Sequence, residues 1–123
     1  MVMKGSCLCG SVSFTITGEV GAVSACHCSQ CRKQSGHVWS SAQVNASDID
    51  MSGEVRWFES SSSAKRGFCP TCGAFLFWKA HEEDAISFSM GSVNGLTGLK
   101  LEKHIFTVDK GDYYDIADGV PQF

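Results

Sequence analysis

The sequence predicts a mainly β fold with one short helical turn. Residues 11–17 alternate the apolar side chains of Val12, Phe14 and Ile16 with polar ones, which is typical of a strand with one face on a core. Glycines bound this stretch at both ends. The 3.6-residue period of amphipathic helices is scarce in the rest of the chain, so strands are expected to dominate.

The other elements follow in chain order. The helical turn is predicted over residues 29–35, where Ser29 could cap it and the first amides would favour the thiolates of Cys28 and Cys31. The four serines at 60–63 lack the glycine pattern of a phosphate-binding loop and are expected to form a solvated loop. Further strands are predicted at residues 38–44, 55–60, 74–79, 85–90 and 100–107.

The length of 123 residues matches one compact domain, and no repeat or linker divides the chain, so a single domain over residues 1–123 is expected. The longest apolar runs, such as residues 74–78, are far shorter than the ~20 residues that cross a bilayer. No membrane span is therefore predicted. No apolar stretch of a secretory signal precedes Cys7, so a cytoplasmic protein is expected.

The charge pattern indicates metal binding rather than nucleic-acid binding. The formal net charge is −3 and the ten Lys and Arg residues form no long basic run, so no nucleic-acid partner is predicted. Cations near a cysteine would offset thiolate charge. Five cations lie within four residues of a cysteine: Lys4, Arg32, Lys33, Lys65 and Arg66.

Seven cysteines fall into three groups, and an odd number of reduced thiols is poorly explained by disulfides. Cys69 and Cys72 flank a tight turn in FCPTCG, which is typical of a zinc knuckle. Cys7 and Cys9 are the candidates to complete it, because side chains at i and i+2 of an extended strand share a face. Four thiolates make a closed site, so a structural zinc is predicted here.

The middle group, CHCSQC, supplies only three thiolates, from Cys26, Cys28 and Cys31. Three protein ligands and one open position are typical of a catalytic zinc. An iron–sulfur cluster or a redox dithiol is an alternative. A second alternative is an inert site completed by one of four histidines: His27, which would point away from the cysteines in an extended segment, His37, His81 or His104.

Four segments carry a wider similarity: GSCLCGSVSF, ACHCSQCRKQSG, KRGFCPTCGAFLFW, and KHIF followed by YYDIADGVPQF. In this order they resemble the glutathione-dependent formaldehyde-activating enzyme family over nearly the whole chain. The resemblance implies the β-tent fold, with several antiparallel sheets around a structural zinc. It also implies two zinc ions per chain, a structural one on Cys7, Cys9, Cys69 and Cys72 and a catalytic one on Cys26, Cys28 and Cys31.

The activity implied by the resemblance is the addition of glutathione to formaldehyde, with carbon–sulfur lyase chemistry in reverse. The expected partners are a small thiol such as glutathione and a small aldehyde. Arg32, Lys33, Lys65 and Arg66 could hold the carboxylates of a thiol peptide, or only offset thiolate charge. His104, Phe106 and Tyr114 are predicted to be packing residues.

A non-catalytic role is the alternative function. The eukaryotic centromere protein V resembles the same family, so the fold alone does not decide activity. In this reading the chain is a zinc-binding module that contacts a protein partner or carries a thiol.

Overall fold

The computed structural model describes residues 2–123, so only residue 1 of the predicted 1–123 domain lies outside the described residues. A three-stranded antiparallel sheet has the order β1-β2-β5, with the bounds Met3–Ser6, Ser13–Ile16 and Ile49–Ser52. A seven-stranded sheet has the order β10-β3-β4-β9-β8-β7-β6, with the bounds Leu101–Ile105, Val23–Cys26, Trp39–Asn45, Ala85–Ser89, Phe75–Ala80, Ala64–Phe68 and Arg56–Glu59.

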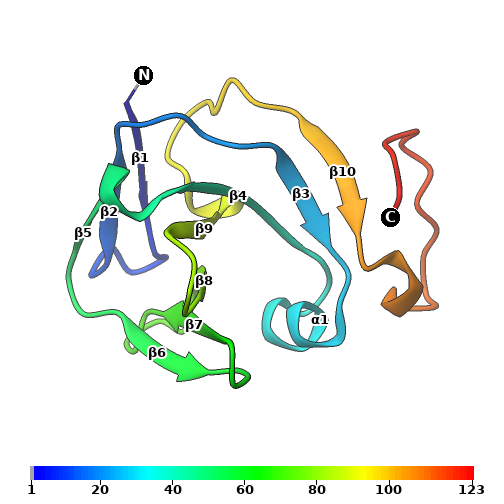
Figure 1. Cartoon of the computed structure of the whole chain (residues 1–123), viewed down its shortest axis with the longest axis horizontal. Helices are drawn as coiled ribbons and strands as arrows, with labels where there is room; N and C mark the ends of the chain where they lie inside the picture. Colours follow the sequence, from blue (N-terminus) through cyan, green and yellow to red (C-terminus); the bar gives the residue numbers. More distant parts are fainter. Residues whose placement is uncertain (1) are drawn as a thin grey trace.

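Figure 1 shows the small sheet at one side of the molecule and β3 and β10 at the other, with the C-terminal segment beside β10. All strand pairings are antiparallel except that of β10 with β3. Helix α1 (Ser29–Ser35) follows β3 closely, and the short 3-10 turns are η1 (Ala46–Asp48), η2 (Met90–Ser92) and η3 (Thr107–Asp109). Among residues 2–123, no helix is long and apolar enough to cross a membrane. The cytoplasmic location stays a prediction.

The predicted fold class is confirmed: ten strands in two sheets are accompanied by one short α-helix in the described chain. Helix α1 occupies the predicted residues 29–35. The six predicted strands correspond to β2, β4, β6, β8, β9 and β10, with ends that match or differ by at most two residues. Residues 11–12 belong to a bend rather than to β2, because the carbonyl of Val12 accepts the N–H of Cys7 and closes a turn.

Four strands, β1, β3, β5 and β7, were not predicted. They are only four or five residues long, and β5 contains no buried residue. In β7 the buried residues include Arg66 and Gly67, so the alternation that marks a strand in sequence is missing. Their pairing partners, which are distant in sequence, make these segments strands.

The core lies between the two sheets. The predicted inner face of β2 is confirmed, since Val12, Phe14 and Ile16 are buried. Phe14 packs against Phe77 of β8 and Phe88 of β9, with ring centroids 5.5 and 6.0 Å apart. This packing brings the turn at the start of β2 towards the turn at the start of β8, and each of these turns carries two cysteines.

Candidate metal centres

The turn between β7 and β8 has the predicted geometry of a knuckle. The N–H of Cys69 donates to the carbonyl of Ala74 at 3.0 Å, and the N–H of Gly73 donates to the carbonyl of Cys69 at 2.8 Å. Gly73 has a φ of +78°, which glycine adopts at little steric cost. The turn therefore places Cys69 and Cys72 close together, as their spacing predicts.

Cys7 and Cys9 lie in a second turn of the same kind, between β1 and β2. The N–H of Cys7 donates to the carbonyl of Val12 at 2.9 Å, and the N–H of Gly10 donates to the carbonyl of Cys7 at 3.2 Å. The predicted extended strand at these cysteines is therefore wrong. A turn closed by Gly10, at a φ of +81°, brings the two sulfurs together instead.

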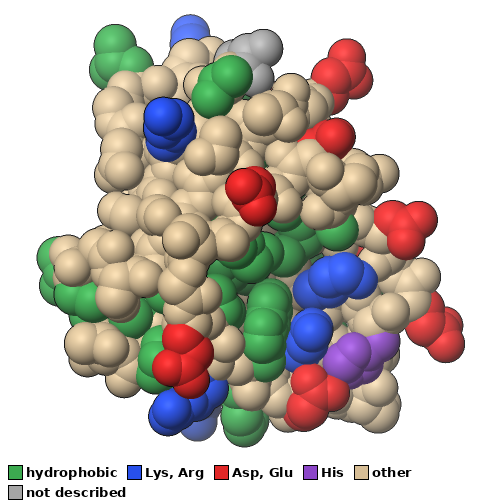
Figure 2. Space-filling model, turned by 90° about the vertical axis from the view of Figure 1, so that its left-hand side faces the viewer, with side chains coloured by type: hydrophobic (Ala, Val, Ile, Leu, Met, Phe, Trp, Pro, Cys, Tyr) green, Lys and Arg blue, Asp and Glu red, His purple; other side chains and the backbone are tan. Residues whose placement is uncertain are grey.

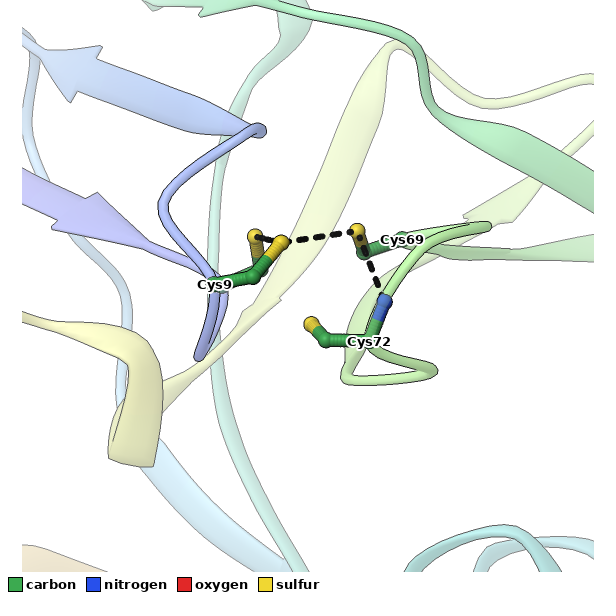
Figure 3. Close-up of side chains that lie close together, drawn as sticks. Cys9, Cys69 and Cys72 are labelled. Carbon is green, nitrogen blue, oxygen red and sulfur yellow. Dashed lines mark hydrogen bonds between the residues drawn. The ribbon is translucent and has the colours of Figure 1, made fainter.

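The two turns face each other, so that four sulfur atoms lie within 4.8 Å of one another. Figure 3 shows Cys9 pointing from its turn towards Cys69 and Cys72. The Sγ of Cys9 is 3.6 Å from that of Cys7 and 3.7 Å from that of Cys69. Cys7 and Cys69 are buried, Cys72 is half-buried and Cys9 is exposed.

The surroundings of Cys7 and Cys69 favour thiolates, since the pKa of each lies below its usual value. The N–H of Val12 points at the Sγ of Cys7 at 3.3 Å, and the N–H groups of Thr71 and Cys72 point at the Sγ of Cys69 at 3.4 Å. The Ser11 hydroxyl and then these amides hold the pKa of Cys69 at about 5. Because four clustered thiolates need a cation to offset their repulsion, this donor set fits a tetrahedral thiolate-bound metal such as zinc.

The middle group is built where β3 runs into helix α1. Cys26 is the last residue of β3, Cys28 directly precedes the helix, and Cys31 lies in its first turn. The cap of α1 is Cys28 rather than the predicted Ser29, because the Sγ of Cys28 accepts the N–H of Cys31 at 3.3 Å. The three sulfurs lie within 4.8 Å of one another, a donor set that also fits a soft divalent metal.

Arg66 of β7 supplies positive charge to this group. Its Nη1 and Nη2 lie 3.6 and 3.7 Å from the Sγ of Cys31, and the side chain is buried. The hydrogen bond with Cys26, assisted by Arg66, lowers the pKa of Cys31 to about 6. Cys31 and burial raise the pKa of Cys26. The thiol of Cys31 therefore loses its proton at a lower pH than the thiol of Cys26.

A cavity of about 460 Å³ opens beside the middle group, whose three cysteines all line it. Its other walls include the aromatic residues Trp39, Trp78 and Phe106 together with Ile105. Phe106 has a left-handed backbone with a φ of 54°, and the residue is 55% exposed, so its predicted packing role is wrong. This volume suits a small organic ligand, which would sit next to the three sulfurs.

The cations proposed from the sequence are only partly placed at this cavity. Among the residues that line it, the cations are Arg66 and Lys103, and Lys103 was not predicted. Lys65 instead lies over the ring of Trp57 at 4.4 Å, and Lys33 lines a second pocket with Arg56. Lys65 and Arg66 are consecutive residues of β7, so their side chains point to opposite faces of the sheet.

The four histidines have partners other than the middle sulfurs. His81 pairs with Glu59 at 2.9 Å, and the Nδ1 of His37 hydrogen-bonds the hydroxyl of Tyr113. Within residues 2–123 the ligand group at Cys26, Cys28 and Cys31 contains no histidine. The alternative of an inert site completed by a histidine therefore has no support in the geometry.

The remaining two histidines form a buried pair at the centre of a polar array that the sequence did not reveal. His27 and His104 hydrogen-bond each other through Nε2 and Nδ1 at 2.9 Å, and both side chains are buried. His104 also contacts Asp118, and His27 contacts Tyr114. The packing role predicted for His104 and Tyr114 is thus incomplete, because both take part in hydrogen bonds. No spacing rule links these four positions in sequence, so the array emerges only from the fold.

Charges of both signs are intermixed on the face of the molecule drawn in Figure 2, around a hollow lined by hydrophobic side chains. This face carries no continuous basic patch of the kind that follows a phosphate backbone.

Comparison with known proteins identifies the family. A family profile described as glutathione-dependent formaldehyde-activating enzyme matches residues 2–109. The chain belongs to this family. The resemblance stated from the cysteine segments is thereby confirmed.

Two individual proteins are similar to this member of the glutathione-dependent formaldehyde-activating enzyme family. A Schizosaccharomyces pombe protein named as an uncharacterized lyase is 26% identical over 127 residues, which cover 98% of this chain and 89% of that protein. A crystal structure of a Rhodobacter sphaeroides protein is 25% identical, covers 78% of this chain and 92% of its own, and superposes with a TM-score of 0.64.

Proposed function

We propose that this protein is a zinc-dependent carbon–sulfur lyase-type enzyme that acts on adducts of a thiol and an aldehyde, such as S-hydroxymethylglutathione. One observation carries the proposal: three cysteines with no fourth protein ligand among the described residues line a cavity of ligand size. Membership of the glutathione-dependent formaldehyde-activating enzyme family and a relative named as a lyase support the same reaction class.

Each cysteine group has its own role in this proposal. Cys7, Cys9, Cys69 and Cys72 hold a structural zinc, because their turns join the two sheets and leave no free ligand position. Cys26, Cys28 and Cys31 hold the catalytic zinc. A zinc held by three thiolates supplies a Lewis-acid position that favours the thiolate form of a bound thiol.

The chemistry needs no oxidant or reductant. In the direction of addition, the thiol sulfur forms a bond to the aldehyde carbon, and the thiol proton ends on the former carbonyl oxygen. In the lyase direction the carbon–sulfur bond breaks and the proton returns to sulfur. The chain's task is to bring sulfur and carbonyl carbon together and to favour the thiolate.

The cavity residues serve this task in different ways. Arg66 offsets the negative charge of the thiolates through its contact with Cys31, so a further anionic sulfur meets less repulsion. Trp39, Trp78 and Phe106 supply apolar walls that reduce the access of water. Lys103 lines the cavity, and in this proposal it pairs with a carboxylate of the thiol.

The test combines glutathione titration, zinc analysis and formaldehyde consumption in the same samples. We expect faster loss of formaldehyde than in buffer with glutathione alone, and loss of this rate in Cys28→Ser. Lys103→Ala is expected to raise the KM for glutathione about tenfold, the effect of losing ~1.4 kcal/mol, whereas Lys100→Ala, outside the cavity lining, is the matched control. If no adduct forms above the uncatalysed rate, the non-catalytic zinc-binding or thiol-carrier role becomes the better explanation.

A further inference from the structure

A polar array links the C-terminal segment to the middle cysteine group through four side chains: both histidines are buried, Tyr114 is half-buried and Asp118 is exposed. Asp118 Oδ2 lies 2.8 Å from His104 Nε2, and His104 Nδ1 lies 2.9 Å from His27 Nε2. His27 Nδ1 lies 2.5 Å from the hydroxyl of Tyr114. These contacts join residues that are 14, 77 and 87 positions apart in sequence.

When both imidazole rings are neutral, one arrangement of protons satisfies every contact in the array. The Asp118 carboxylate can only accept, so Nε2–H of His104 donates to it. Nδ1 of a neutral His104 then accepts from Nε2–H of His27, and Nδ1 of His27 accepts the hydroxyl proton of Tyr114. The carboxylate at one end thus selects the tautomer of both rings and orients the hydroxyl at the other end.

His27 is where the array meets the metal ligands. Its neighbours in the chain are Cys26 and Cys28, and its side chain is only 1% exposed. The backbone N–H of His27 also donates to the carbonyl of Ile105 in β10 at 3.0 Å. Both the backbone and the ring of this residue are therefore fixed, which restricts the rotation of the two peptide units that carry the neighbouring cysteines.

The C-terminal segment is held against β10 by backbone contacts as well. The N–H of His104 donates to the carbonyl of Pro121 at 2.8 Å, and the N–H of Phe123 donates to the carbonyl of His104 at 2.9 Å. Tyr114 and Asp118 lie outside residues 2–109, which the family profile matches. This anchoring presents both side chains to the histidines.

We infer that Asp118, His104 and Tyr114 are positioning residues that act through His27 to hold Cys26 and Cys28 in the conformation that binds the catalytic metal. The inference rests on the proposed function only in placing a metal on Cys26, Cys28 and Cys31. Groups beyond the ligands commonly change metal affinity by about 10- to 100-fold. The array has the position and the fixed hydrogen bonds to act in this way.

The test reads the metal itself rather than turnover. The full chain is loaded with cobalt(II), whose sulfur-to-metal charge-transfer bands report each thiolate site, and Cys28→Ser identifies the bands of the middle site. Release of the middle metal to a chelator is then followed in Tyr114→Phe, which removes only the hydroxyl that pairs with His27. Tyr113→Phe is the matched control, because this neighbouring hydroxyl pairs with His37 outside the array.

We expect Tyr114→Phe and Asp118→Ala to release the middle cobalt about tenfold faster than wild type, with altered middle-site bands and unchanged bands of the four-cysteine site. Asp118→Asn should restore part of the wild-type rate, because its amide oxygen can still accept from His104. Tyr113→Phe should match wild type. The four-cysteine bands also report whether each variant is folded.

Two negative results have different meanings. Wild-type release rates in both Tyr114→Phe and Asp118→Ala, with a middle cobalt present, would overturn the positioning role and leave the proposed function standing. A wild-type chain that takes up no cobalt at Cys26, Cys28 and Cys31 would overturn the proposed function and the positioning role together.

Discussion

Cys69 and Cys28 differ in how strongly the fold depends on their sulfur atoms. Cys69 is fully buried and accepts two backbone N–H groups within a turn that joins two strands. Cys28 is half-buried and caps helix α1 through its sulfur. A serine at position 28 can take over the cap, because serine is among the best residues for that place. A serine at position 69 cannot replace a thiolate ligand.

Cys69→Ser is therefore expected to lower the Tm by at least about 10 °C or to prevent folding, because binding of a structural zinc is part of the folding free energy. Cys28→Ser should change the Tm by less than about 3 °C. Thermal melts of zinc-loaded protein make the comparison. Equal losses of stability in the two variants would mean that both metals are structural.

Asp118 gives the protein a pH-dependent contact at the residue scale. The hydrogen bond from His104 holds the pKa of Asp118 below its usual value of 3.8. Because the folded-state pKa lies below the unfolded one, the carboxylate stabilises the fold above about pH 4, and this contribution is lost as the pH falls through the folded-state pKa.

The destabilisation caused by Asp118→Asn should thus be full at pH 5 to 7 and should shrink at pH 3. Chemical denaturation of wild type and variant across this range measures it, and Asp115→Asn on the same segment serves as the control. If the difference in unfolding free energy between wild type and Asp118→Asn stays constant down to pH 3, the carboxylate does not have this role.

At the scale of elements, the turns decide where the sulfurs go. The connection from β5 to β6 passes so close to the first cysteine turn that a Cβ on Gly53 would lie 1.9 Å from the carbonyl oxygen of Ser11. Gly53 also has a φ of +95°. The Ser11 hydroxyl in turn lies 3.2 Å from the Sγ of Cys69. The β5–β6 loop therefore packs against Ser11, whose hydroxyl contacts the four-cysteine group.

Gly53→Ala is expected to combine backbone strain with this clash. Gly95→Ala is the matched control, because Gly95 has a φ of +79° and open space around its Cβ position. The control should cost about 1 kcal/mol of unfolding free energy, and Gly53→Ala at least about 2 kcal/mol more. Urea denaturation of the two variants decides this. A similar cost in both would show that the loop yields without strain.

For the whole molecule, the two candidate metal sites differ in the number of cysteines and in what surrounds them. The four-cysteine site lies between two turns that close the core, and releasing its metal would loosen both sheets. The three-cysteine group lies beside a cavity, so a metal bound there could leave without opening of the core. We therefore expect metal to leave the three-cysteine group faster than the four-cysteine group.

Freshly prepared, reduced protein should contain about two zinc ions per chain, and a chelator should remove the middle one at least about tenfold faster. Metal analysis during timed exposure to the chelator measures both rates, with Cys28→Ser as the single-site reference. Fewer than one zinc per chain, or simultaneous release of both ions, would contradict the division into a closed and an open site.

The sequence alone determined the fold class and the helix at residues 29–35, because their patterns are local in the chain. It also determined the division of seven cysteines into four and three, because the close pair Cys69 and Cys72 needs two more ligands and the middle group keeps three. The 1–123 domain stays a prediction. Tertiary structure decided that Cys7 and Cys9 share a turn, that Lys103 lines the cavity, and that His27, His104, Asp118 and Tyr114 meet. These features depend on strands and loops distant in sequence coming together, and such contacts carry no periodic signal along the chain.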